Sequence, residues 1–176
     1  MKTIVVYKSK SNFVKNYADW IAKNLSADIF EASTVTSDKL LEYDTIIYGG
    51  GLYAGRINGV KLIKKNIHDL KGKNIVVFFS GASSPNEKAI NEVKNNNFDE
   101  EMQKNIRFFY LRGGFDYNKL KSFDKLLMNM LKFTLKRKKN LSADDRGMLS
   151  AYDNPVDFTK EKNIDELISY VNSKAK

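Results

Sequence analysis

The stretch Thr3-Ile4-Val5-Val6-Tyr7-Lys8-Ser9-Lys10-Ser11-Asn12-Phe13 decides the fold class of this chain. Its first five residues are all β-branched or aromatic, which is typical of a buried strand, and a mostly polar loop follows. Apolar residues then recur at helical spacing, at Val14, Tyr17, Ala18, Ile21 and Leu25. A strand that leads through a short polar loop into a helix is the usual first unit of a parallel α/β sheet.

The same alternation continues along the chain. Further strands are predicted at residues 27–32, 43–48, 73–79 and 106–111. Helices are predicted at 60–70, from Ser84 with Pro85 as the first helical residue, and from about Lys160. Because parallel neighbours need crossover connections, this order predicts a doubly wound parallel sheet of five strands with helices on both faces.

One segment, from about residue 117 to 152, is predicted to be an insertion after the fifth strand. Up to Lys139 its apolar residues form a helical stripe, which predicts an inserted amphipathic helix. This helix ends in five basic residues, Lys132, Lys136, Arg137, Lys138 and Lys139. A looser stretch is predicted from Asn140 to Tyr152.

Because the chain has 176 residues, we expect the whole of it, 1–176, to form a single domain.

The amino-acid composition excludes several kinds of catalytic and metal site. The chain has no cysteine and one histidine, His68, which excludes disulfides, cysteine nucleophiles, iron–sulfur ligation and His/Cys zinc sites. No catalytic side chain is predicted, and demanding chemistry would belong to a cofactor. The net charge of +9 favours anionic partners. No apolar run is long enough for a signal peptide or a membrane span, so we expect a cytoplasmic protein.

Three loops at the carboxyl ends of the predicted strands are the candidate ligand site, because open parallel sheets bind ligands there. The first supplies hydroxyls, amides and a helix N-terminus, which suit a phosphate, although such a turn also simply caps a helix. The alternative for the second loop is a flexible turn, and for the third a strand exit that feeds the Ser84 cap. The candidate residues are Ser9, Lys10, Ser11, Asn12, Phe13 and Val14; Gly51, Leu52, Tyr53, Ala54 and Gly55; and Ser80, Gly81, Ala82 and Ser83.

The first loop and its helix, from Tyr7 to Asn12 and from Tyr17 to Ala22, resemble those of flavodoxins. Three further parts resemble the branch that contains the menaquinone-dependent protoporphyrinogen oxidases and their flavodoxin-domain relatives. These parts are Tyr43–Gly49 leading into Leu52–Ile57, then Leu111–Tyr117, and Asn154–Thr159. The resemblance covers nearly the whole chain.

This resemblance implies a flavodoxin-like fold with strand order 2-1-3-4-5 and FMN as the cofactor. It places the phosphate on the first loop, Tyr53 against the isoalloxazine ring, and the third loop at the pyrimidine edge. It also implies oxidation of protoporphyrinogen IX with a quinone acceptor. Asn12 and Val14 stand where relatives carry glycine and threonine. Asparagine tolerates positive φ, but valine cannot donate a hydrogen bond, which predicts weaker FMN binding.

Three functions are open at this point. An FMN-dependent oxidoreductase acting on a small molecule or quinone is ranked first. A flavodoxin-type electron carrier is ranked second, because the carriers known in this family are acidic whereas this chain has a net charge of +9. A cofactor-free binding module is third. The basic helix predicts peripheral contact with an anionic membrane, or else packing on the sheet or in a dimer. The clustering of its basic residues at one end, without interleaved aromatic residues, argues against nucleic acid.

Overall fold

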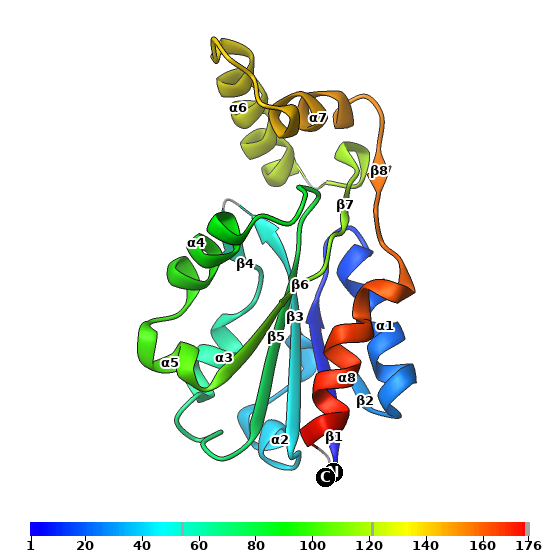
Figure 1. Cartoon of the computed structure of the whole chain (residues 1–176), viewed down its shortest axis with the longest axis vertical. Coiled ribbons are helices and arrows are strands. Elements are labelled where there is room, and N and C mark those ends of the chain that lie inside the picture. The colour runs from blue at the N-terminus through cyan, green and yellow to red at the C-terminus, as the bar shows by residue number, and fades with distance from the viewer. Residues whose placement is uncertain (54, 121, 175–176) are drawn as a thin grey trace.

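The computed structural model describes residues 1–53, 55–120 and 122–174, which form an α/β structure around one central sheet (Figure 1). The strands are β1 (Thr3–Lys8), β2 (Asp28–Glu31), β3 (Thr45–Tyr53), β4 (Arg56–Ile57), β5 (Asn74–Ser80), β6 (Ile106–Tyr110), β7 (Gly114–Phe115) and β8 (Val156–Asp157). The α-helices are α1 (Phe13–Leu25), α2 (Ser37–Leu41), α3 (Lys61–Asn66), α4 (Glu87–Asn97), α5 (Glu100–Lys104), α6 (Ser122–Arg137), α7 (Ala143–Ala151) and α8 (Asp165–Lys174). Short 3-10 helices are η1 (Ala32–Thr34), η2 (Tyr117–Lys119) and η3 (Glu161–Ile164).

The central sheet has the predicted topology. Its strands pair in parallel in the order β2-β1-β3-β5-β6, and the two-residue β4 adds an antiparallel partner to β3. With β5 and β6 as the fourth and fifth main strands, the predicted order 2-1-3-4-5 is confirmed. Helices α1 and α8 cover one face, and α3, α4 and α5 cover the other (Figure 1). The strand order reverses beside β1, so a crevice is expected at the carboxyl ends of β1 and β3.

Alternating side chains of β5 show how the sheet separates two cores. Ile75, Val77 and Phe79 join the core under α3 and α4, whereas Val76 and Phe78 join the core under α1 and α8. Successive residues of a strand point to opposite faces, so a strand covered on both faces needs an unbroken apolar run. The run Ile75–Phe79 meets this need.

The glycine run after the third predicted strand corrects one expectation. Gly51, Leu52 and Tyr53 were expected in a loop, but β3 continues to Tyr53 and then folds back so that Leu52 pairs with Ile57. The reason is steric. A Cβ atom on Gly49 would lie 2.1 Å from the Phe78 ring, and one on Gly50 would lie 2.6 Å from Ile57. Glycine here permits close strand packing instead of a flexible turn.

Several helix boundaries also differ from the prediction: α3 covers only Lys61–Asn66 of the predicted 60–70, and α8 begins at Asp165 after the 3-10 helix η3. Helix α4 begins at Glu87 and not near Ser84, because the Asn86 side chain accepts a hydrogen bond from the Ala89 backbone N–H at 3.1 Å. Asparagine caps helices as well as serine does, and proline favours an extended residue before it. In the insertion, the observed helix α6 (Ser122–Arg137) is shorter than the helix predicted up to Lys139. The stretch from Asn140 to Tyr152, which was expected to be loose, contains α7. A capping box of Ser142 and Asp145 starts α7.

Helices α6 and α7 stand beyond the carboxyl edge of the sheet and are joined to it through the β7–β8 pair (Figure 1). A small separate core holds this part together, made by Phe115, Leu120, Ala151 and Tyr152. Ala82, from the loop after β5, packs against the same core. The insertion is therefore in contact with the third candidate loop.

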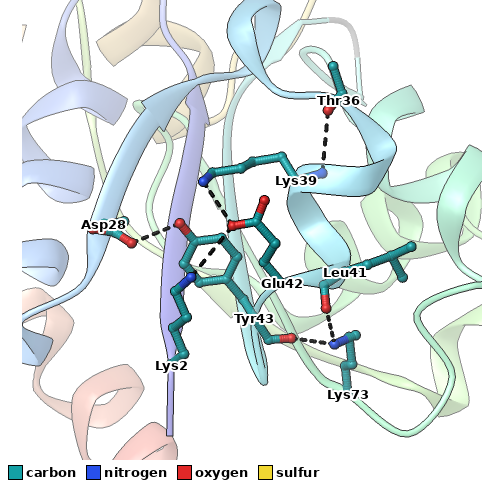
Figure 2. A network of polar contacts seen from close by, with 8 residues as sticks. All are labelled: Lys2, Asp28, Thr36, Lys39, Leu41, Glu42, Tyr43 and Lys73. Atoms are coloured by element: carbon teal, nitrogen blue, oxygen red, sulfur yellow. Dashed lines mark hydrogen bonds and ion pairs between the residues drawn. The ribbon is translucent and has the colours of Figure 1, made fainter.

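A polar network closes the opposite end of the sheet (Figure 2). The Tyr43 hydroxyl donates a hydrogen bond to Asp28 at 2.7 Å, and the Lys73 ammonium donates to the Tyr43 carbonyl at 2.6 Å. Glu42 lies within 3.0 Å of Lys39 and 3.5 Å of Lys2. This network ties β1, β2, α2 and the start of β5 together at the end away from the candidate loops, where it serves the fold.

Candidate functional site

The three predicted loops meet at one cavity of about 290 Å³ at the carboxyl edge of the sheet. Twelve of the predicted residues line it: Ser9, Lys10, Ser11, Phe13, Val14, Gly51, Leu52, Tyr53, Ser80, Gly81, Ala82 and Ser83. Asn12 and Gly55 are not among its lining residues, and Ala54 lies outside the described residues. Segments far apart in the sequence thus converge where the strand order reverses.

The first loop presents an open helix N-terminus. Asn12 is the N-cap of α1 and adopts φ 67°, the positive value expected for a residue in a glycine position. Its side chain makes no capping hydrogen bond, and the first turn of α1 contains no acidic residue. The first backbone N–H groups of a helix lack helical partners and carry partial positive charge. This end of α1 therefore suits an anionic group such as a phosphate.

Two serines that line the cavity have hydroxyls without a partner among the described residues. The Oγ atoms of Ser9 and Ser80 are buried and form no hydrogen bond with any described residue. Ser9 belongs to the first loop, and Ser80 ends β5 at the start of the third. Buried hydroxyls are nearly always hydrogen-bonded, because an unpaired one costs about 1–3 kcal/mol. Both residues line the cavity, so the donor set fits a polar ligand such as the phosphate and polar edge of a flavin nucleotide.

The side chain of Val14 cannot donate or accept a hydrogen bond. It is 4% exposed and packs in the core beneath α1, with its side chain also reaching the cavity. The first loop therefore offers no side-chain donor to a ligand at this position. Fewer donors to a phosphate mean weaker binding, by about one to two orders of magnitude for one charged hydrogen bond.

Tyr53, Lys10 and Asp124 form a cluster that the sequence does not reveal. The Lys10 ammonium lies 4.2 Å from the centre of the Tyr53 ring and 2.6 Å from the Asp124 carboxylate. Asp124 belongs to α6 and is 4% exposed. Burial, with a contribution from the charge of Asp124, raises the pKa of Tyr53 to about 12. The insertion thus places a negative charge directly on the lysine of the first loop.

Replacing Asp124 by asparagine is therefore expected to strengthen FMN binding by about tenfold. The change removes a carboxylate that competes with the phosphate for Lys10, and charge-assisted hydrogen bonds of this kind carry about that much free energy. Fluorescence titration with FMN at low salt measures it. Asp153→Asn is the matched control, since this exposed acid just after the insertion lies 3.9 Å from Lys132 and outside the cavity. Equal or weaker binding by Asp124→Asn would contradict the competition.

The far wall of the cavity was not predicted. Helix α4, strand β7 and the insertion supply mostly apolar side chains there: Ala89, Ile90, Val93, Phe115, Leu120, Met128, Leu131 and Met148. Their only sequence signal is apolar spacing on helices, which is the same for an ordinary core residue. The site therefore has a polar side on the first loop and an apolar side on the insertion.

The described residues contain no cluster of acidic, histidine or cysteine side chains that could hold a metal ion.

A comparison with family models adds the decisive observation. The model of the flavodoxin domain matches residues 4–142. The chain belongs to the flavodoxin family. This membership supports FMN as the cofactor of the cavity, and the predicted fold agrees with it.

Flavodoxins and flavoproteins are among the solved structures to which this chain is similar at low sequence identity. A flavodoxin from the domain Archaea is 17% identical, with 87% of this chain and 97% of that chain covered and a TM-score of 0.44. Flavodoxin 1 from Bacillus cereus is 17% identical, covering 81% and 100%, with a TM-score of 0.44. A flavoprotein in complex with FMN from Lactobacillus acidophilus is 20% identical, covering 63% and 91%, with a TM-score of 0.40. No curated protein matches the chain.

Proposed function

We propose that this flavodoxin-family protein is an FMN-dependent oxidoreductase. One observation carries the proposal: Ser9 and Ser80, whose buried hydroxyls have no partner among the described residues, line the same cavity beside the uncapped N-terminus of α1. Such a donor set suits a phosphorylated ligand with a polar ring edge. When bound, FMN would supply the electron-transfer chemistry that the chain's own side chains lack.

Different residues of the cavity would contact different parts of FMN. Ser9, Ser11 and the N-terminal amides of α1 would hold the phosphate, and Lys10 would add positive charge. Tyr53 would contact the isoalloxazine ring, and the backbone of Gly81 and Ala82 would face its polar edge. Apolar side chains from α4 and the insertion exclude water from the remaining side, which favours an apolar substrate there.

Within this class, we propose a protoporphyrinogen oxidase-like reaction with a quinone acceptor. The apolar wall formed by Met128, Leu131 and Met148 supports a hydrophobic acceptor, and the net charge of +9 supports a substrate with carboxylates. Each step would remove a pair of electrons and a pair of protons from the porphyrinogen and convert one quinone to its quinol. An electron carrier would need no apolar wall of this kind.

Substituting Tyr53 by alanine tests the flavin site. FMN binding is expected to weaken by about tenfold, because aromatic stacking and burial contribute about that much free energy, and quenching of flavin fluorescence is expected to diminish. Fluorescence titration of the parent and of Tyr53→Ala measures both effects. Tyr7→Ala, at a half-buried tyrosine outside the cavity lining, is the control. Unchanged affinity and quenching in Tyr53→Ala would remove Tyr53 from the site.

The reaction itself is tested with FMN-loaded protein. Anaerobic mixing of the reduced protein with a soluble naphthoquinone is expected to return the oxidised flavin spectrum, and addition of protoporphyrinogen IX is expected to yield fluorescent protoporphyrin. Reoxidation by the quinone without turnover of the porphyrinogen would keep the FMN-dependent oxidoreductase but overturn the protoporphyrinogen oxidase-like reaction. Absence of both would overturn the enzyme proposal and favour the carrier.

A further inference from the structure

Helix α6 carries an apolar stripe that faces away from the cavity. Leu126, Met130 and Phe133 are 58%, 62% and 56% exposed, and their i, i+4, i+7 spacing aligns them on one side of the helix. Met128 and Leu131, by contrast, line the cavity. Apart from Met1 and Leu41, all the exposed large apolar side chains of the described residues lie on α6. A cluster of this kind marks an interaction surface.

Basic side chains continue this stripe at its C-terminal end. Arg137 is the next residue along it, and its guanidinium lies 3.9 Å from the centre of the Phe133 ring. Lys136 and Lys139 are exposed, and neither forms an ion pair with the described residues. Lys132 and Lys138 differ, since Lys132 lies 3.9 Å from Asp153 and Lys138 lies 2.5 Å from Asp145. The positive charge available to a partner is therefore that of Lys136, Arg137 and Lys139.

The charge pattern selects an anionic lipid surface over a second copy of this chain. Asp124 is the only acidic residue of α6, and it is buried against Lys10. Two copies meeting through α6 would bring their basic ends onto a face with no acidic partner on that helix. Anionic headgroups, in contrast, attract clustered lysine and arginine, while the apolar stripe enters the boundary of the acyl chains.

The position and length of α6 agree with attachment in the plane of a membrane. None of the helices described is long and apolar enough to span a membrane, and α6 has 16 residues. Figure 1 places α6 at the tip of the molecule, at the end opposite to the start of β1 and the end of α8. Nothing in the sheet therefore blocks the approach of a flat surface to α6.

We propose that α6 docks the protein on an anionic bilayer, with Leu126, Met130 and Phe133 at the acyl boundary and Lys136, Arg137 and Lys139 among the headgroups. Docking does not require the flavin. If the proposed function also holds, the apolar side of the cavity lies just beneath the docked helix, where a membrane-dissolved quinone would enter.

Flotation with vesicles tests the docking. The full chain without FMN is expected to float at low salt with vesicles containing about one third phosphatidylglycerol in phosphatidylcholine, and not with phosphatidylcholine alone. Substituting Lys136, Arg137 and Lys139 by glutamine is expected to lower partitioning by about 100-fold. The matched control substitutes Lys61, Lys65 and Lys71, exposed lysines on and after α3, by glutamine and should keep its partitioning.

A second variant tests the apolar part of the surface. Leu126→Ser, Met130→Ser and Phe133→Ser together are expected to abolish flotation while leaving FMN affinity and the melting temperature unchanged, because these side chains are exposed and outside the cavity. Loss of flotation in both α6 variants supports docking. Parent protein that does not float, or floats equally in all variants, overturns it. So does a parent dimer, seen by sedimentation, that the serine variant converts to monomer. Failure of FMN binding alone would overturn only the proposed function.

Discussion

Replacing Ser9 and Ser11 together by alanine is expected to weaken FMN binding by about 10- to 100-fold. Both residues line the cavity beside the N-terminus of α1, and the buried hydroxyl of Ser9 has no partner within the described part of the chain. Each hydroxyl that donates to a charged phosphate contributes about 1.5–3 kcal/mol, and partial compensation by the helix amides reduces the combined loss. Because the Ser9 hydroxyl has no hydrogen-bond partner among the described residues, its removal should leave the melting temperature of the apoprotein nearly unchanged.

Riboflavin provides the sharpest control for this experiment, since it lacks the phosphate. The parent and the double variant should bind riboflavin equally if the two hydroxyls act on the phosphate alone. Ser37→Ala and Ser150→Ala, at exposed serines outside the cavity, should leave FMN affinity at the parent value. An unchanged dissociation constant for FMN in the double variant would move the phosphate away from the first loop.

Substituting Gly49 by alanine is expected to lower the free energy of unfolding by about 3 kcal/mol. The added Cβ would lie 2.1 Å from the Phe78 ring, which is fully buried and packs edge-on against the Tyr17 ring at 6.5 Å between centroids. Phe78 cannot move aside without displacing Tyr17 and α1. Overpacking in a dense core costs about 1–3 kcal/mol, and a contact this short belongs at the upper end.

Gly147→Ala makes the same chemical change with the opposite expected sign. Gly147 lies within α7, and a Cβ there would meet nothing within 4 Å. Alanine is favoured over glycine in a helix interior by about 1 kcal/mol, so this variant should be stabilised. Urea denaturation of both variants measures the difference. If Gly49→Ala unfolds at the same urea concentration as the parent, β3 and β5 are not packed as closely as the structure shows.

Local patterns predicted the sheet because each strand carries its own signal. The runs at Thr3–Tyr7 and Ile75–Phe79 are apolar enough to require burial wherever the chain places them. Helix α7 was missed, although the capping pair Ser142 and Asp145 was visible in the sequence. The weak apolar pattern after Asn140 obscured that signal.

Other features depend on contacts between distant parts of the chain. Lys10 and Asp124 are separated by 114 positions, and neither has a neighbour in the sequence that indicates their pairing. The glycines after Tyr48 were interpreted as a loop because glycine marks turns, whereas their role depends on Phe78 and Ile57 pressing against them from other strands. Residue type showed that the backbone was special at these positions, but only tertiary packing shows why.

The continuation of β3 through its glycines has a thermodynamic consequence for the cavity. Tyr53 ends a paired strand, with its backbone registered against Arg56, and its position is set before any ligand arrives. A residue in a free loop would lose about 1–2 kcal/mol of backbone conformational entropy when a ligand ordered it. Here that loss accompanies folding, so a ring that stacks on Tyr53 meets a preorganised surface and retains more of its interaction energy as affinity.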